Sequence, residues 1–335
     1  MKKHLIAAAV AAAFAVPAMA QVTVSGKLRF AYEDADKNSA GATTAATGEA
    51  AQSSAGKLQG LRVTDGDFRL TATEDLGGGM RATAYMEVQS RGRGTGIAGR
   101  DAAIMLSGGF GSVLIGAVEA ANGIEPLAAA GAPGFGDLDS NNFGYNVLRG
   151  AGNADLFQYT TPELAKGLTF RAAIVDQVIG RGGLESASTV QDASVIGFNY
   201  TGGPLTVAGD YTTWGNNAAT PSASTSDSRT RISGNYNLGV ARIGLGYETR
   251  KFGNAAKDNQ SMVGVSVPLG ALTLGLTYAE AKLTGTAKRS GIDGGLNYAL
   301  SKRTFAGVHY LRSEDKNATT VGTDTRFRIQ LGHSF

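Results

Sequence analysis

Apolar and polar residues alternate along this chain in short segments that glycine-rich or polar connections separate. In the first segment, residues 22–33, the apolar residues Val24, Leu28 and Phe30 occupy even positions, and Lys27 and Arg29 occupy odd positions. Successive side chains of a β-strand point to opposite faces, so this pattern predicts a strand with one apolar and one polar face. The same pattern predicts fifteen further strands, centred on residues 68–72, 80–88, 102–106, 113–115, 157–159, 168–174, 196–200, 205–211, 232–238, 243–247, 263–269, 272–278, 292–300, 306–310 and 327–335.

The connections between these segments alternate in length. Seven are short turns, at residues 77–79, 108–111, 162–167, 202–204, 238–239, 269–270 and 300–303. Eight are polar and mostly longer, at residues 34–60, 92–99, 119–152, 177–190, 215–227, 252–259, 283–288 and 315–323. Membrane barrels of the bacterial outer membrane have short turns on one side and long loops on the other. Sixteen strands with both termini on the turn side produce this count of connections.

The last predicted strand continues to the final residue. Phe327, Ile329, Leu331 and Phe335 share one face of it, and the chain ends on the aromatic residue. Chain ends are usually polar and poorly ordered. An apolar terminal strand therefore indicates that the last strand is paired, as it is in a closed barrel that has no free edge.

A soluble β-sandwich is the alternative architecture, because its strands also alternate. Tyrosines distinguish the two, since aromatic girdles mark the two membrane interfaces of an outer-membrane barrel. Nine tyrosines fall on the apolar register, at positions 32, 159, 200, 211, 236, 247, 278, 298 and 310. The pattern favours an all-β fold, a 16-stranded antiparallel transmembrane β-barrel.

The first twenty residues have the features of a cleaved secretory signal. Lys2 and Lys3 precede an apolar stretch at 5–16, and Ala18-Met19-Ala20 forms a small-residue cleavage site. A transmembrane anchor is the alternative, but the stretch is short and Pro17 interrupts it. We expect a signal peptide at 1–20, a barrel domain at 21–335, and export to the cell outer membrane.

Charge and composition argue against several other classes of protein. Removal of the two signal lysines leaves 29 basic against 28 acidic residues, a net charge of +1, so the high pI does not imply nucleic-acid binding. The chain has no cysteine, so disulfides do not hold this exported protein together. Only His309 and His333 remain after the signal, and no metal-binding or phosphate-binding motif is present. We expect neither an enzyme nor a bound cofactor or metal.

Several stretches resemble the trimeric Gram-negative general porins of the β-proteobacterial type. They include the first mature strand, two hairpin turns, a Tyr/Pro/Gly element, a further turn and the C-terminus, at residues 21–29, 73–79 (Thr-Glu-Asp-Leu-Gly-Gly-Gly), 108–113, 153–167, 300–304 (Leu-Ser-Lys-Arg-Thr) and 333–335. The resemblance implies a 16-stranded barrel, a homotrimer and passive diffusion of small hydrophilic solutes. Asp67 and Arg69 depart from the family, which usually has Arg and Gly there, so selectivity is the property that the resemblance transfers least.

A barrel of sixteen strands leaves an aqueous channel that something must narrow. By resemblance, the third long loop, residues 119–152, folds inward; the alternative is a loop that projects outward. If the barrel closes, inward-register cations of neighbouring strands line one wall: Lys27, Arg29, Arg69, Arg81, Arg326 and Arg328. Asp137 and Asp139 on the loop would face them. Because these cations outnumber the two acids, we expect a weak preference for anions.

Two other functions remain open on the sequence. A substrate-specific outer-membrane channel for a sugar or organic acid would show saturable block by one solute, and an adhesin or enzyme barrel would conduct few ions. The expected partners of the porin are two further copies of the chain, outer-membrane lipid and lipopolysaccharide, and small hydrophilic solutes and ions.

Overall fold

The computed structural model describes residues 21–37, 56–90, 97–119, 123–136, 138, 153–176, 193–215, 226–253, 256–282, 288–317 and 320–335. The expected signal peptide at 1–20 and the two loop acids, Asp137 and Asp139, lie outside these residues.

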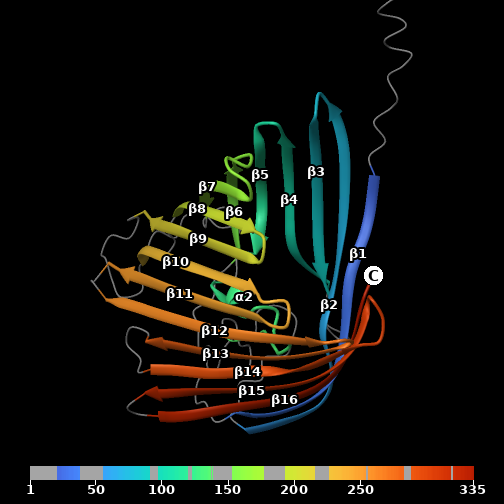
Figure 1. Cartoon of the computed structure of the whole chain (residues 1–335), viewed down its shortest axis with the longest axis vertical. Coiled ribbons are helices and arrows are strands. Elements are labelled where there is room, and N and C mark those ends of the chain that lie inside the picture. Colours follow the sequence, from blue (N-terminus) through green and yellow to red (C-terminus); the bar gives the residue numbers. More distant parts are fainter. Residues whose placement is uncertain are drawn as a thin grey trace, which may run out of the picture.

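Strands make up nearly all of the described part of the chain, together with one short helix, α2 (Glu125–Ala128) (Figure 1). The strands are β1 (Gln21–Lys37), β2 (Gly56–Gly77), β3 (Met80–Gln89), β4 (Ala98–Gly108), β5 (Gly111–Glu119), β6 (Asn153–Thr160), β7 (Leu168–Asp176), β8 (Ala193–Gly202), β9 (Leu205–Trp214), β10 (Ser226–Asn237), β11 (Arg242–Phe252), β12 (Lys257–Leu269), β13 (Leu272–Lys282), β14 (Lys288–Ala299), β15 (Thr304–Asn317) and β16 (Thr320–Ser334). No helix in the described residues is long and apolar enough to cross a membrane.

Each strand pairs with the next in antiparallel fashion, and β1 pairs with β16, so the sheet closes into a barrel. The closure reaches the last residue: Phe335 and Gly26 exchange two backbone hydrogen bonds of 2.9 Å. A Cβ atom on Gly26 would lie 2.6 Å from the Phe335 ring, so the glycine makes room for that ring. The predicted strand count, the closed antiparallel barrel and the paired terminal strand are confirmed.

The apolar register faces outward, as predicted. Side chains such as Val22, Ile104 and Leu245 are more than half exposed although they are aliphatic. Eight of the nine tyrosines on this register are at least about a third exposed, and Tyr200 is half-buried. A surface of this kind is stable against hydrocarbon, with aromatic rings at the water interfaces.

The hydrophobic core lies inside the barrel. Its buried side chains come from the third long loop and from the inner faces of β12, β13 and β15: Ile124, Ala128, Phe135, Leu138, Met262, Ala279 and Leu311. Figure 1 shows α2 within the ring of strands, on the side of β10 to β12. The described part of this loop, residues 123–136 and 138, therefore lies inside the barrel, as the resemblance implies.

The first external connection is shorter than predicted. Residues 34–60 were expected to form a loop, but β1 continues to Lys37 and β2 begins at Gly56. Here polar residues occupy the outward face as well, and Gln59 donates a hydrogen bond to Asp34 across the pair. Alternation of hydrophobicity cannot reveal a strand once it leaves the apolar layer, because both faces are then polar.

Candidate functional site: the constricted pore

Glycines on three neighbouring strands form the surface against which the loop packs. Cβ atoms added to Gly244 and Gly264 would each lie 2.4 Å from the Ala128 carbonyl oxygen. On Gly246 and Gly275, added Cβ atoms would lie 2.8 Å from Ile124 and 2.6 Å from a loop alanine. Because β11 to β13 carry no side chain at these inward positions, the helix α2 and the loop residues that follow it approach the wall closely.

Hydrogen bonds from the wall hold the loop in place. The Ser266 hydroxyl donates to the Ala130 carbonyl at 2.7 Å, and the Asn235 amide donates to the Leu127 carbonyl at 3.3 Å. The Asp293 carboxylate accepts both the Phe135 and the following backbone N–H, each at 2.9 Å. Charge-assisted bonds to two successive amides fix the position of the loop at Phe135.

Phe135 lies against two arginines of β16. The guanidinium carbons of Arg326 and Arg328 are 4.3 and 4.1 Å from its ring centroid, within the range of cation–π contacts. The His309 ring meets it edge-on at 6.1 Å. The sequence-predicted residues Arg326 and Arg328 thus contact the inward loop itself, and they are almost fully buried there.

Glu33 of β1 compensates part of this positive charge. It pairs with Arg328, with Arg326 at 3.7 Å, and with Arg62 of β2 at 3.1 Å. This group joins three guanidinium groups to the Glu33 carboxylate. Glu33 and Arg62 were not among the predicted site residues.

A second group of charges, the β1–β4 charge network, lines the adjoining wall. Lys27 pairs with Asp65 at 2.9 Å and with Asp67 at 3.2 Å, while Arg29 reaches Asp65 at 3.5 Å. The remaining contacts tie β2 to β3 and β4: Arg100–Asp67 2.8 Å, Arg100–Glu87 3.3 Å, Arg69–Glu87 2.6 Å and Arg69–Asp101 3.5 Å. Among the described residues, four cations meet four carboxylates, so the formal charge of the network is zero.

Within the β1–β4 charge network, three of the cationic side chains are nevertheless more exposed than the carboxylates. The side chains of Lys27, Arg29 and Arg69 are 38–40 % exposed, whereas the carboxylate side chains they pair with are between 4 and 15 % exposed. The acids lie in the wall and the cationic ends cover them. The cationic ends are therefore the more accessible part of this network.

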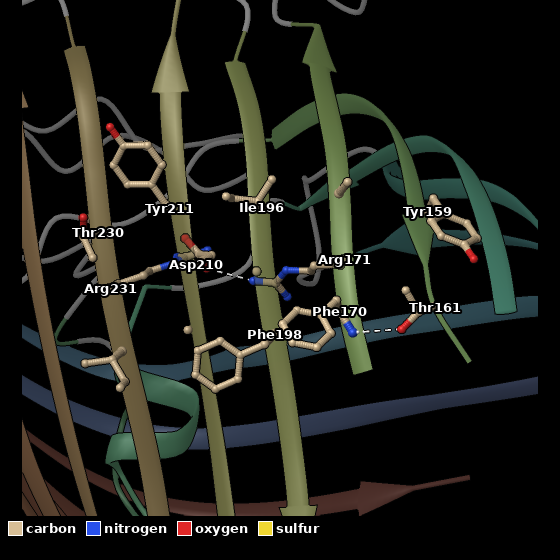
Figure 2. A pocket seen from close by; sticks show the side chains of 14 residues that line it. Tyr159, Thr161, Phe170, Arg171, Ile196, Phe198, Asp210, Tyr211, Thr230 and Arg231 are labelled. Carbon is tan, nitrogen blue, oxygen red and sulfur yellow. Dashed lines mark hydrogen bonds and ion pairs between the residues drawn. The ribbon is translucent and has the colours of Figure 1, made fainter. Parts of the chain in front are cut away.

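The opposite wall carries what we call the Asp210 cluster. Asp210 of β9 pairs with Arg231 at 2.6 Å, with Arg171 at 2.8 Å and with Arg229 at 3.9 Å. Figure 2 shows Arg171 of β7 and Arg231 of β10 approaching Asp210. Arg171 spans β8 because Gly197 lies between the two strands; a Cβ there would be 2.9 Å from the Arg171 Nε atom.

The outer surface of these same strands is apolar. A hollow of about 600 Å³ over β6 to β10 is lined mainly by outward residues, among them Phe170, Ile196, Phe198 and Tyr211. Phe170, Ile196 and Tyr211 are each more than 40 % exposed. Figure 2 shows these side chains with the charged residues of the same strands. One strand thus presents guanidinium groups to water on one side and rings to the membrane on the other.

The remaining predicted residue is placed apart from the others. Arg81 is exposed at the turn end of β3, six positions along the strand from Glu87, the partner of Arg69. At about 3.4 Å per residue this separation is about 20 Å. The structure thus brings together Lys27, Arg29 and Arg69, places Arg326 and Arg328 at Phe135, and leaves Arg81 near the turns.

Two local features explain the partners that sequence reasoning missed. The pairing of β1 with β2 shifts between Arg29 and Phe30, so that Arg29 faces Asp65 while Phe30 faces Val63. This bulge brings Arg62 and Asp65 onto the same inner face, which strict alternation does not allow. Arg100 and Asp101 lie at the start of β4, before the apolar residues that revealed that strand.

Comparison with known proteins supports the same architecture. The family model for Gram-negative porins matches residues 7–318. An outer membrane porin of Bordetella pertussis is 27% identical over 98% of this chain and its own full length, and outer membrane porin protein 32 of Delftia acidovorans is 29% identical over 97% of this chain and 93% of its own. A solved anion-selective porin from Comamonas acidovorans superimposes with a TM-score of 0.70 at 21% identity, covering 94% of this chain and all of that one.

Proposed function

The chain belongs to the Gram-negative porin family, and from this premise we propose that its pore passes small hydrophilic anions somewhat more readily than cations. The protein is an outer-membrane porin, a channel rather than an enzyme, through which small hydrophilic solutes diffuse passively. A substrate-specific channel is not favoured. The proposal concerns the selectivity of the pore and the residues that produce it.

The difference in exposure between cations and carboxylates carries this proposal. In the β1–β4 charge network Lys27, Arg29 and Arg69 reach the lumen, and their carboxylate partners lie beneath them. A low-dielectric wall focuses such fields on passing ions, but the formal neutrality of the β1–β4 charge network keeps the preference weak.

The reversal potential in a salt gradient tests the proposed selectivity. We expect a weak anion preference for the native pore and a smaller one after Lys27→Gln, Arg29→Gln and Arg69→Gln are combined, because the buried acids then lose their covering cations. Arg303→Gln, at a turn, is the matched control and should leave the potential unchanged. Cation preference in the native pore would falsify the proposal.

We further propose that three copies form the working channel. The outer face of β1 to β5 has a hollow that is lined by the small side chains of Ala72, Ala84 and Ala102 and by larger ones such as Val22 and Ile104. Small outward residues allow two barrels to approach closely inside a membrane. The rest of the outer face, with its tyrosines, would contact membrane lipid and lipopolysaccharide.

Assembly can be measured directly on detergent-purified protein. A homotrimer predicts a native mass of three chains and conductance that increases in groups of three equal steps. A single-chain mass together with single steps would contradict the proposal.

A further inference from the structure

Cations gather on the outer surface of β11 to β15, where these strands reach the loop side of the barrel. The five strands are neighbours in the sheet and lie side by side in Figure 1. We call the group the β11–β15 cationic belt; its members, all exposed, are Lys251, Lys257, Lys282, Lys288, Arg312 and Lys316. Each lies an even number of residues from an exposed tyrosine or valine of its own strand, so the belt is on the outer face and not in the pore.

Two cross-strand pairs of the belt bring like charges together. Lys251 faces Lys257 in the pairing of β11 with β12, and Lys282 faces Lys288 in the pairing of β13 with β14. Like charges directly opposite one another destabilise a sheet. An anion held between the facing lysines would remove this repulsion.

Acids on the same surface neutralise only part of the belt. Glu280 pairs with Lys288 at 2.6 Å. Glu314 pairs with Arg312 and lies 3.8 Å from Lys316. Half of the cations in the belt therefore have a carboxylate partner on the outer face.

The other half of the belt has no carboxylate partner in the described part of the chain. These residues are Lys251, Lys257 and Lys282. Asp227, exposed at a bulge of β10, is the next acid along this surface. The loop-side connections between β9 and β16 contain no charged residue in the sequence beyond the described strands, at 216–225, 254–255, 283–287 and 318–319. Six cations thus meet three acids, and the belt keeps a net positive charge.

The belt lies directly beyond the tyrosines that mark the membrane interface. Lys282 is four positions past Tyr278 on β13, and Arg312 is two positions past Tyr310 on β15, about 14 and 7 Å at the usual strand rise. The Tyr278 hydroxyl donates to Glu280 at 2.9 Å, so the aromatic girdle and the belt are in contact. Lipid head groups lie at this level of an outer-membrane barrel, with their acyl chains along the aliphatic band below.

The opposite side of the barrel lacks such a belt. At the loop ends of β1 and β2, the outward register of the described residues carries Asp34 and Asp36 against one lysine, Lys57. That side also holds the hollow proposed above as the contact between copies. The belt therefore lies away from that contact and faces lipid.

We propose that the β11–β15 cationic belt binds the phosphate groups of lipopolysaccharide, an inference that rests on the contact with lipopolysaccharide proposed above and names its site. Ammonium and guanidinium groups donate charge-assisted hydrogen bonds to phosphate oxygens. A phosphate between facing lysines also relieves their repulsion, while the acyl chains lie along exposed aliphatic residues such as Leu276. A zwitterionic phospholipid gains less, because its own ammonium group accompanies its phosphate.

Removal of phosphate from the ligand tests the belt directly. Lipopolysaccharide, and the same lipopolysaccharide after dephosphorylation, are titrated into the detergent-purified protein, and the two dissociation constants are compared. The dephosphorylated form should bind about tenfold more weakly or less tightly still, because each basic residue near an anionic head group adds to the attraction. Equal dissociation constants would overturn the proposal.

A pair of triple variants tests the residues. The belt variant combines Lys251→Gln, Lys257→Gln and Lys282→Gln. It should weaken the binding of lipopolysaccharide about tenfold or more. The matched control removes the same charge from exposed positions on the turn side, and combines Lys166→Gln, Lys302→Gln and Arg303→Gln. Its dissociation constant should equal that of the native protein. Unchanged affinity in the belt variant, or an equal loss in both variants, would refute the site.

The outcome can be distinguished from failure of the functions proposed above. Because the belt lies outside the barrel, the belt variant should keep the reversal potential of the native pore in potassium chloride, which also shows that it has folded. Equal binding of both forms of lipopolysaccharide to the native protein would refute the belt but leave the lipid contact standing. Binding of neither form would refute that contact together with the belt, and would leave the selectivity proposal untouched.

Discussion

Asp293 shows how much of the constriction depends on one side chain. It is buried on β14, and its two carboxylate oxygens accept the successive backbone amides of Phe135 and Gly136. A Cβ atom on Gly134 would lie 2.6–2.7 Å from the same carboxylate, so the loop backbone passes directly over it. The position of the loop within the pore therefore depends on this carboxylate.

Replacement of Asp293 by alanine should loosen the loop. The buried Phe135 amide loses its acceptor, at a cost of about 1–3 kcal/mol, and the partly buried Gly136 amide loses the same partner. We expect a lower unfolding temperature and a noisier, altered single-channel conductance. Glu163→Gln, at an exposed turn, is the control. Conductance and noise equal to those of the native pore would show that other contacts hold the loop.

At the scale of elements, the strands share one outer pattern but differ on their inner faces. β1 to β4 carry charged side chains on the inner face, and β11 to β13 carry glycines where α2 and the loop residues after it pack. The outer face must be apolar everywhere because it meets hydrocarbon. The inner face is free to vary, so the wall is built differently where the loop rests and where solutes pass.

Gly264→Ala tests this packing surface. The added methyl group would lie 2.4 Å from the Ala128 carbonyl oxygen, so α2 must move away from the wall. Overpacking of this kind costs about 1–3 kcal/mol, and the displaced helix should reduce the conductance. Gly99→Ala is the matched control, because nothing lies within 4 Å of its added methyl group. Native stability and conductance in Gly264→Ala would contradict the close contact.

For the whole molecule, the near balance of charges limits what selectivity the pore can have. The anion preference proposed above comes from the arrangement of cations over buried carboxylates. Such an arrangement acts over short distances and is sensitive to screening by salt.

The anion preference should therefore fall as salt rises. The Debye length decreases from about 30 Å at 0.01 M to about 3 Å at 1 M, so the field of the wall no longer spans the lumen. Reversal potentials at a fixed tenfold gradient, measured at increasing mean salt concentration, should approach zero. A constant reversal potential would instead indicate selection by direct binding at a narrow site.

Much of the fold was predictable because its determinants are local. Alternation along each segment revealed sixteen strands and the outward register, and the apolar end at Phe335 indicated closure. The inward loop followed from resemblance to a family, since its packing surface appears in the sequence only as isolated glycines such as Gly244 and Gly264. The extension of β1 and β2 beyond the apolar layer was missed because alternation of hydrophobicity ends where both faces of a strand are polar.

The charged site was predictable only in part. The sequence by itself determined which face each strand turns to the membrane, because hydrocarbon selects one side of every pleat. Only the tertiary structure decided which charges meet: a bulge brings Arg62 to Glu33, and Gly197 lets Arg171 reach Asp210 across an intervening strand. Those contacts depend on register between segments, and the pattern within a single segment carries no information about register.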